Sequence, residues 1–212
     1  MKTIRIKNEQ NIQQIEHTVL VLGYFDGLHK GHQALFAEAR KIAAAKDLKI
    51  AVLTFPESPK LAFVRYQPSL MLHLTSPEER LQQLENLGVD YLYLVDFTSQ
   101  FARNTAEQFF TKYISRLKAK TVIAGFDYHF GSDRRSAEDL EKLFEGQVII
   151  VPSVNFNGVK ISSTRIRETV LAGNVAESNQ LLGYSLSTSG IVVHGNARGR
   201  TIGYPTANLA PL

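Results

Sequence analysis

The stretch VLVLGYFDGLHKGHQALFAEARKIAAAKDLKIAVLTF, residues 19–55, decides the fold. It holds two apolar runs, residues 19–25 and 49–55, with a helical pattern over residues 31–46 between them. Short, mostly apolar runs are typical of strands buried on both faces of a parallel sheet. One face of the intervening helix carries small and apolar side chains, at Leu35, Ala39, Ile42 and Ala43. The stretch is therefore predicted to form a strand–helix–strand unit.

The same alternation continues along the chain. Further strands are predicted at residues 89–97, 121–126 and 148–151, and further helices at residues 105–118, 136–145, 162–172 and 175–182. Two helix starts carry capping boxes, Ser76 with Glu79 and Thr105 with Gln108. Five strands separated by helices predict an α/β fold, a Rossmann-like, doubly wound parallel five-stranded sheet. In such sheets ligands bind at the carboxyl ends of the strands.

The pattern changes after residue 182. Residues 190–195 look like a strand, and glycine and β-branched residues dominate from there on. We therefore expect two parts, a complete α/β domain over residues 1–184 and the start of an all-β domain over residues 185–212. The second part is too short to close a β-domain alone.

Composition narrows the function classes. The 212-residue chain is 44% hydrophobic, which excludes global disorder, and it has no cysteine, which excludes disulfides and a thiol nucleophile. Its apolar runs fall far short of the roughly 20 residues that span a bilayer, and its first residues lack the apolar core of a signal peptide. We therefore expect a cytoplasmic protein with no membrane partner. The net charge of +4 is spread along the chain, so we expect an anionic small molecule and no nucleic acid.

The most informative segment is GYFDGLHKGH, residues 23–32, which joins the first strand of the quoted unit to its helix. Gly27 and Gly31 leave room for a turn and for a phosphate close to the backbone. His29 and His32 flank the helix start, where two imidazoles and free N–H groups are able to face one anion. The alternatives are a zinc site or two unrelated polar residues, and no third zinc ligand lies nearby in the sequence.

Three other segments follow strands or open helices. Residues 161–167, ISSTRIR, combine hydroxyls, a helix start and two guanidiniums, which together predict an anion-binding site. A capped surface helix would show the same sequence pattern. Arg165 and Arg167 lie two residues apart, so at most one is expected to reach a given phosphate. Residues 125–131 contain aromatic rings and an aspartate that are able to contact a planar ligand, or else these are core aromatics. Residues 54–59 also contain an aromatic ring, and their alternative is a rigid proline loop. A parallel sheet gathers all four segments at one edge.

Together these motifs resemble the nucleotidyltransferase superfamily, and the whole set resembles bacterial bifunctional FAD synthetase. The resemblance covers residues 19–182 for the FMN adenylyltransferase module. The segment GYPTAN, residues 203–208, resembles the opening of the riboflavin kinase module, a β-barrel domain. Some flavin-side residues differ from the family pattern: Pro56 precedes Glu57, Ser58 replaces a common histidine, and Ser136 stands where glycine is expected.

The resemblance implies ATP-dependent adenylyl transfer to FMN, giving FAD and pyrophosphate, with Mg²⁺ bridging the phosphates. It implies catalytic roles for His29, His32 and Arg167. The ATP site it implies consists of Gly23, Phe25, Asp26, Gly31, Ser162, Ser163 and Thr164. Asp127 and Phe130 would contact the flavin, and Thr206 and Asn208 would serve ATP and Mg²⁺ in the kinase module.

Three readings stay open. Besides an FMN adenylyltransferase, the sequence fits a nucleotidyltransferase for another phosphorylated substrate. It also fits a flavin- or nucleotide-binding protein that no longer turns over, because the altered residues lie on the flavin side. Riboflavin kinase activity is expected only in a longer chain, and the oligomeric state is open.

Overall fold

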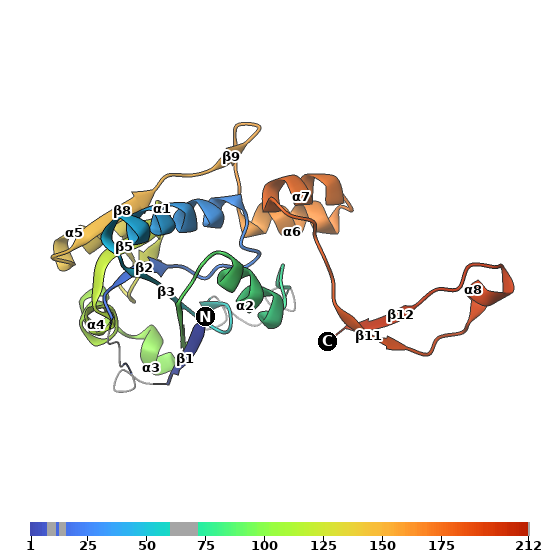
Figure 1. Ribbon diagram of the computed structural model, residues 1–212, viewed down its shortest axis with the longest axis horizontal. Coiled ribbons are helices and arrows are strands. Elements are labelled where there is room, and N and C mark those ends of the chain that lie inside the picture. Colours follow the sequence, from blue (N-terminus) through green and yellow to red (C-terminus); the bar gives the residue numbers. More distant parts are fainter. Residues whose placement is uncertain (8–11, 13–15, 60–71, 212) are drawn as a thin grey trace.

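The computed structural model describes residues 1–7, 12, 16–59 and 72–211. Its centre is a six-stranded parallel sheet in the order β1-β4-β3-β2-β5-β8 (Figure 1). The strands are β1 (Lys2–Ile6), β2 (Thr18–Leu22), β3 (Lys49–Thr54), β4 (Tyr91–Val95), β5 (Ala119–Gly125) and β8 (Gln147–Val151). Strand order reverses at the β2–β5 pair, which is the switch point where such folds bind ligands.

The doubly wound α/β class is confirmed, but the prediction of five strands was one short. The additional strand, β1, pairs in parallel with β4 from Lys2–Tyr91 to Ile6–Val95. It lies at the edge of the sheet, and three of its five residues are exposed. An edge strand needs no continuous apolar run, so the apolar pattern that marks the other five strands does not mark β1.

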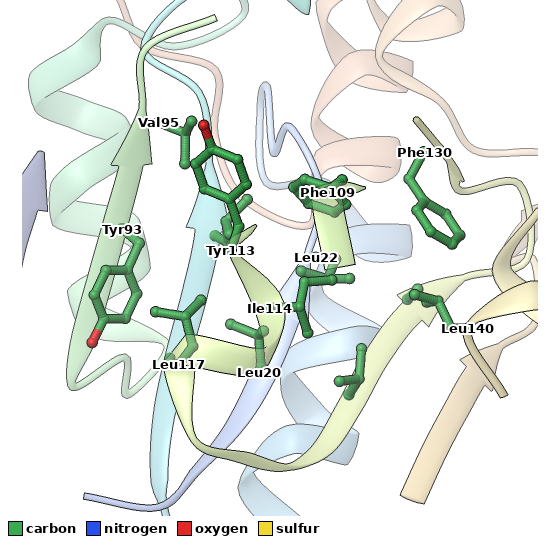
Figure 2. Close-up of a cluster of buried hydrophobic side chains, with 14 of the residues drawn as sticks. Leu20, Leu22, Tyr93, Val95, Phe109, Tyr113, Ile114, Leu117, Phe130 and Leu140 are labelled. Carbon is green, nitrogen blue, oxygen red and sulfur yellow. The ribbon is translucent and has the colours of Figure 1, made fainter. Parts of the chain in front are cut away.

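Alternate residues of β2 point to opposite layers of the domain. Val19 and Val21 pack with helix α1 (Lys30–Lys46) and with α2 (Pro77–Asn86), while Leu20 and Leu22 belong to the second core. Figure 2 shows this second core, where Phe109, Tyr113, Ile114 and Leu117 surround the β2 leucines. The two hydrophobic cores lie on opposite faces of the sheet and fix the positions of the carboxyl ends of its strands.

Two helix starts follow the sequence closely. The capping boxes at Ser76/Glu79 and Thr105/Gln108 are both present. The helix expected over residues 105–118 is divided into α4 (Ala106–Lys112) and a 3₁₀ turn, η4 (Ile114–Leu117), with Tyr113 between them at φ −118°. The Tyr113 ring is buried against Phe101 and Phe109, so packing of the ring accompanies the break. The other short elements between β4 and β8 in the sequence are α3 (Ser99–Ala102), β6 (His129–Phe130), β7 (Arg135–Ser136), η5 (Ala137–Asp139) and α5 (Leu140–Leu143).

The chain after β8 forms a hairpin, two helices and a second hairpin. These elements are β9 (Asn155–Phe156), β10 (Val159–Lys160), α6 (Ser163–Leu171), α7 (Val175–Leu182), β11 (Gly190–Val193), α8 (Arg198–Thr201) and β12 (Asn208–Pro211). The β9–β10 hairpin turns at an Asn-Gly pair, with positive φ at Asn157 and Gly158. The β11–β12 hairpin projects away from the α/β domain (Figure 1). No helix of the described residues is long and apolar enough to cross a membrane.

Candidate active site

The loop from β2 to α1 has an unusual backbone. Phe25, Gly27 and Leu28 have φ values of 62°, 75° and 34°, in the left-handed region that side chains disfavour. The Phe25 ring folds back over Gly23, where an added Cβ would lie 2.6 Å from its nearest ring carbon. The ring is buried and packs at 5.2 Å from the rings of His32 and Phe36. The glycine and the phenylalanine of this motif are therefore fitted to each other.

His29 and His32 form a stacked pair at the start of α1. Their ring centroids lie 3.8 Å apart with an interplanar angle of 13°. His29 is the N-cap of the helix, and its Nδ1 accepts a hydrogen bond of 3.3 Å from the His32 backbone N–H. An Nδ1 that accepts leaves the proton of a neutral imidazole on Nε2. The buried Nδ1 of His32 makes no hydrogen bond within the part of the chain that the structure describes.

Burial keeps both imidazoles neutral. It lowers the pKa of His29 from 6.5 to about 4, against smaller opposing effects that include the charge of Asp26. Burial also lowers the pKa of His32 well below 6.5, with further lowering from His29 and Lys160. At neutral pH each ring therefore offers one N–H. A bound polyanion would favour the charged forms and raise both pKa values.

Asp26 ties this loop to α6. Its Oδ2 accepts from Arg167 Nη2 at 2.7 Å, its Oδ1 from the Leu74 N–H at 2.8 Å, and its carbonyl from Ser163 Oγ at 2.9 Å. The carboxylate is 3% exposed. Arg167 also donates from Nε to the Leu72 carbonyl at 2.8 Å. Asp26 thus supports the site through its neighbours and keeps Arg167 at the cavity wall.

The two arginines of the ISSTRIR segment face different ways, as their spacing predicted. Ser162 caps α6 by accepting from the Arg165 N–H at 3.2 Å. The Arg165 side chain pairs with Glu177 at 2.9 Å and donates to the carbonyls of Phe156 and Val159. Arg165 therefore fastens the β9–β10 hairpin and α7, and Arg167 alone of the two lines the cavity.

One cavity of about 590 Å³ collects the predicted residues. This volume lies within the range of roughly 300–1,000 Å³ usual for ligand pockets. The structure brings together there all twelve residues that the sequence proposed for the catalytic, ATP and flavin contacts: Gly23, Phe25, Asp26, Gly31, His29, His32, Ser162, Ser163, Thr164, Arg167, Asp127 and Phe130. Thr206 and Asn208 lie outside this cavity, in the projecting hairpin. Asn208 is the first residue of the exposed strand β12, and Thr206 lies just before that strand.

Sequence reasoning found Phe130 and the segment that contains Phe55, but it missed most of the aromatic part of this cavity. Phe55, Phe97, Phe101 and Phe109 line it, and we call these four rings the aromatic wall. Phe55, Phe97 and Phe101 stand edge to face at 5.0–5.5 Å, and Phe109 continues the row at 5.8 Å from Phe101. The rings come from four separate segments, so no local motif announces them. Such a wall suits a planar, apolar ring system.

Lys160 is a second residue that the sequence did not single out. Its ammonium forms an ion pair with Asp127 and lies 4.7 Å from the centre of the Phe126 ring. It lines the cavity, and its charge is among the groups that lower the pKa values of His29 and His32. In the sequence, only its position directly before the ISSTRIR segment could have indicated that Lys160 belongs to the site.

Nothing in the described residues resembles a metal cage. They contain no group of three or more histidine or acidic side chains placed to hold a metal ion. Both carboxylate oxygens of Asp26 are already engaged by Arg167 and Leu74. Among the described residues, no third side chain is placed with the stacked histidines as a three-ligand zinc site would require.

A parallel sheet with a glycine-containing loop and a helix start facing one cavity at its switch point defines a Rossmann-like α/β fold. A solved pantoate-beta-alanine ligase from Francisella tularensis has this fold, with a TM-score of 0.51 and 13% identity over 92% of this chain and 91% of that one.

The chain belongs to the FAD synthetase family, whose profile matches residues 11–165. The riboflavin kinase profile matches residues 182–212. A Listeria monocytogenes protein named bifunctional riboflavin kinase/FMN adenylyltransferase is 42% identical over 90% of this chain. This chain spans 62% of that protein's length. A Streptococcus pneumoniae structure titled macrolide-efflux protein is 57% identical, with a TM-score of 0.94 over 98% of this chain and 68% of that one.

Proposed function

We propose that this chain transfers AMP from ATP to FMN, forming FAD and pyrophosphate. The observation that carries the proposal is the single cavity in which the histidine pair, the start of α6 and Arg167 adjoin the aromatic wall. Its lining offers N–H, hydroxyl and guanidinium donors for phosphates, and it also offers rings for a flavin. The family match supports the choice of FMN as the acceptor.

In the proposed reaction a phosphate oxygen of FMN attacks the α-phosphorus of ATP in line. A bond forms between that oxygen and the α-phosphorus, the bond to the β-phosphate oxygen breaks, and pyrophosphate leaves. Such a step needs positioning and charge neutralisation and no protein nucleophile. We assign His29 and His32 to the α- and β-phosphate oxygens, and Ser163, Thr164 and Arg167 to the β- and γ-phosphates.

The histidine pair suits this task because burial holds both rings neutral and in place. Each neutral ring donates one hydrogen bond, and its pKa would rise as charge accumulates on the phosphate oxygens. Fixed donors that need no reorganisation are the usual source of transition-state stabilisation. Gly23, Phe25, Asp26 and Gly31 would shape the ATP side, with Asp26 acting through Arg167 rather than on the nucleotide.

On the flavin side we propose that the aromatic wall and Phe130 contact the isoalloxazine ring. Phe130 is buried and lies 6.1 Å from Phe109, centroid to centroid (Figure 2). Asp127 is half exposed and paired with Lys160, so it is accessible to a polar edge of the ring once that pair loosens.

We propose that Mg²⁺ acts with the substrate phosphates. The residues fit an ion held by phosphate oxygens and water, because the described part of the chain offers no protein cage and hydrated Mg²⁺ is usual at nucleotide sites. When bound it would neutralise phosphate charge. His29, His32 and Arg167 would still orient the triphosphate.

We propose a division into an adenylyltransferase domain, residues 1–184, and the start of a riboflavin kinase domain, residues 185–212. The kinase-profile match over residues 182–212 supports this division. Thr206 and Asn208 would serve ATP and Mg²⁺ there, and riboflavin phosphorylation would require a longer chain. We infer that the protein acts in the cytoplasm, where ATP and FMN are available.

The test is product analysis with FMN and MgATP, alongside a panel of other phosphorylated acceptors. FAD and pyrophosphate in equal amounts from FMN support the proposal. Pyrophosphate release with another acceptor, and none with FMN, would make the chain a different nucleotidyltransferase. Tight FMN or ATP binding by calorimetry without any turnover would make it a binding protein.

A further inference from the structure

The loop that carries Phe25, Gly27 and Leu28 in left-handed conformations must be held by its surroundings, since such backbone is unfavourable on its own. Asp26 is held through its carboxylate and its carbonyl, as described above. The N–H of Gly27 donates to Thr75 Oγ1 at 3.4 Å. The Leu28 carbonyl accepts from Gln33 Nε2 at 2.9 Å.

The remaining contact comes from a distant part of the chain. The Tyr184 hydroxyl donates to the Gly27 carbonyl at 2.8 Å, across 157 positions of sequence. Gly27 is buried, so this carbonyl has little access to water. Tyr184 lies outside the stretch matched by the FAD synthetase profile, residues 11–165, and inside the stretch matched by the riboflavin kinase profile, residues 182–212.

The segment around Tyr184 is itself fastened to the α/β domain. Gln33 Nε2 bridges Leu28 to the carbonyl of Leu182 at 2.8 Å, and the Leu186 N–H donates to Asn179 Oδ1 at 2.7 Å. Farther on, the hydroxyls of Ser187 and Ser189 both donate to Glu79 Oε1, at 3.3 and 3.2 Å. The Tyr184 ring packs on the small apolar cluster that contains Ile166 and Leu182, and Leu74 packs on the same cluster. Tyr184 is therefore held in place on both sides of its hydrogen bond.

We propose that Tyr184 is a positioning residue for adenylyl transfer. It fixes the Gly27 peptide, and with it the order of the loop that presents His29 to the triphosphate and holds Asp26 against Arg167. Tyr184 is the last residue of the proposed adenylyltransferase domain and lies within the stretch matched by the riboflavin kinase profile, so this junction between the two parts contributes to the adenylyltransferase site. This inference rests on the proposed function, because it concerns the same loop.

The experiment compares the full chain with Tyr184→Phe, which keeps the ring and removes only the hydroxyl. Ser185→Ala is the matched control, since it removes an exposed hydroxyl one residue away. We expect Tyr184→Phe to lower kcat/KM for ATP about tenfold, the effect of losing one hydrogen bond to a buried carbonyl. The KM for FMN should stay within about twofold in both variants.

Hydrogen exchange separates positioning from general stability. In Tyr184→Phe the peptide covering residues 23–32 should exchange faster while peptides from β3 and β4 stay unchanged, and Ser185→Ala should match the unaltered chain throughout. If Tyr184→Phe retained full kcat/KM for ATP, the inference would be wrong. Uniformly faster exchange across all peptides would equally overturn it. If the unaltered chain formed no FAD, the proposed function would fail instead, which is a distinguishable result.

Discussion

Replacing Arg167 by methionine should destabilise the fold and abolish transfer. The substitution removes the 2.7 Å bond to Asp26 and the 2.8 Å bond to the Leu72 carbonyl, and it leaves a carboxylate that is 3% exposed with only the Leu74 N–H. Breaking a buried ion pair costs about 3–5 kcal/mol. Because Arg167 is itself 29% exposed, water screens part of this interaction, and we expect a loss of about 2 kcal/mol.

For a chain of 212 residues, about 2 kcal/mol corresponds to a fall in Tm of roughly 4–8 °C. Calorimetry at pH 7 measures it. The double variant Asp26→Asn with Arg167→Met should recover part of the loss, since no unpaired charge remains. Arg165→Met is the matched control: it breaks the pair with Glu177 and should lower Tm, yet retain transfer. An Arg167→Met protein that melts within 1 °C of the unaltered chain would refute this reasoning.

Three further results are expected. The folded-state pKa of His29, about 4, lies below its ordinary 6.5, so the unfolded chain binds the proton first as the pH falls. Urea unfolding should therefore show stability declining between pH 6.5 and 4, by about 3 kcal/mol from this group, and declining less in His29→Gln. Gly27→Ala should lower Tm more than Gly158→Ala, because both glycines have positive φ but only at Gly27 would a Cβ meet Leu74, at 2.7 Å. Phe101→Ala should raise the KM for FMN about five- to tenfold and leave the KM for ATP unchanged, by steady-state kinetics.

The sequence predicted those features that depend on local chemistry. The buried strands show as apolar runs, and the helix starts at Ser76 and Thr105 show as capping boxes that the structure confirms. The His-x-Gly-His and ISSTRIR segments were expected to converge because parallel strands end at one edge. The cavity that contains both agrees with that argument.

What the sequence left out depends on tertiary packing. Strand β1 has the alternating, mostly exposed pattern of an edge and carries little apolar signal. The aromatic wall is assembled from rings on four segments, and the local sequence of each ring is that of an ordinary core residue. Tyr184 is a single tyrosine just after the end of α7, with no sequence motif around it, and only the folded chain brings its hydroxyl to Gly27. The pairing of Asp26 with Arg167 likewise requires the structure.

The most direct test of adenylyl transfer follows the α-phosphate. The chain is incubated with FMN, Mg²⁺ and ATP labelled at the α-phosphorus, and the products are separated. We expect the label in FAD and none in pyrophosphate, a loss of at least about 100-fold in rate for His29→Ala and for His32→Ala, and little change for His17→Ala, an exposed histidine outside the cavity. Normal FAD formation by His29→Ala or His32→Ala, or the absence of labelled FAD from the unaltered chain, would contradict the account.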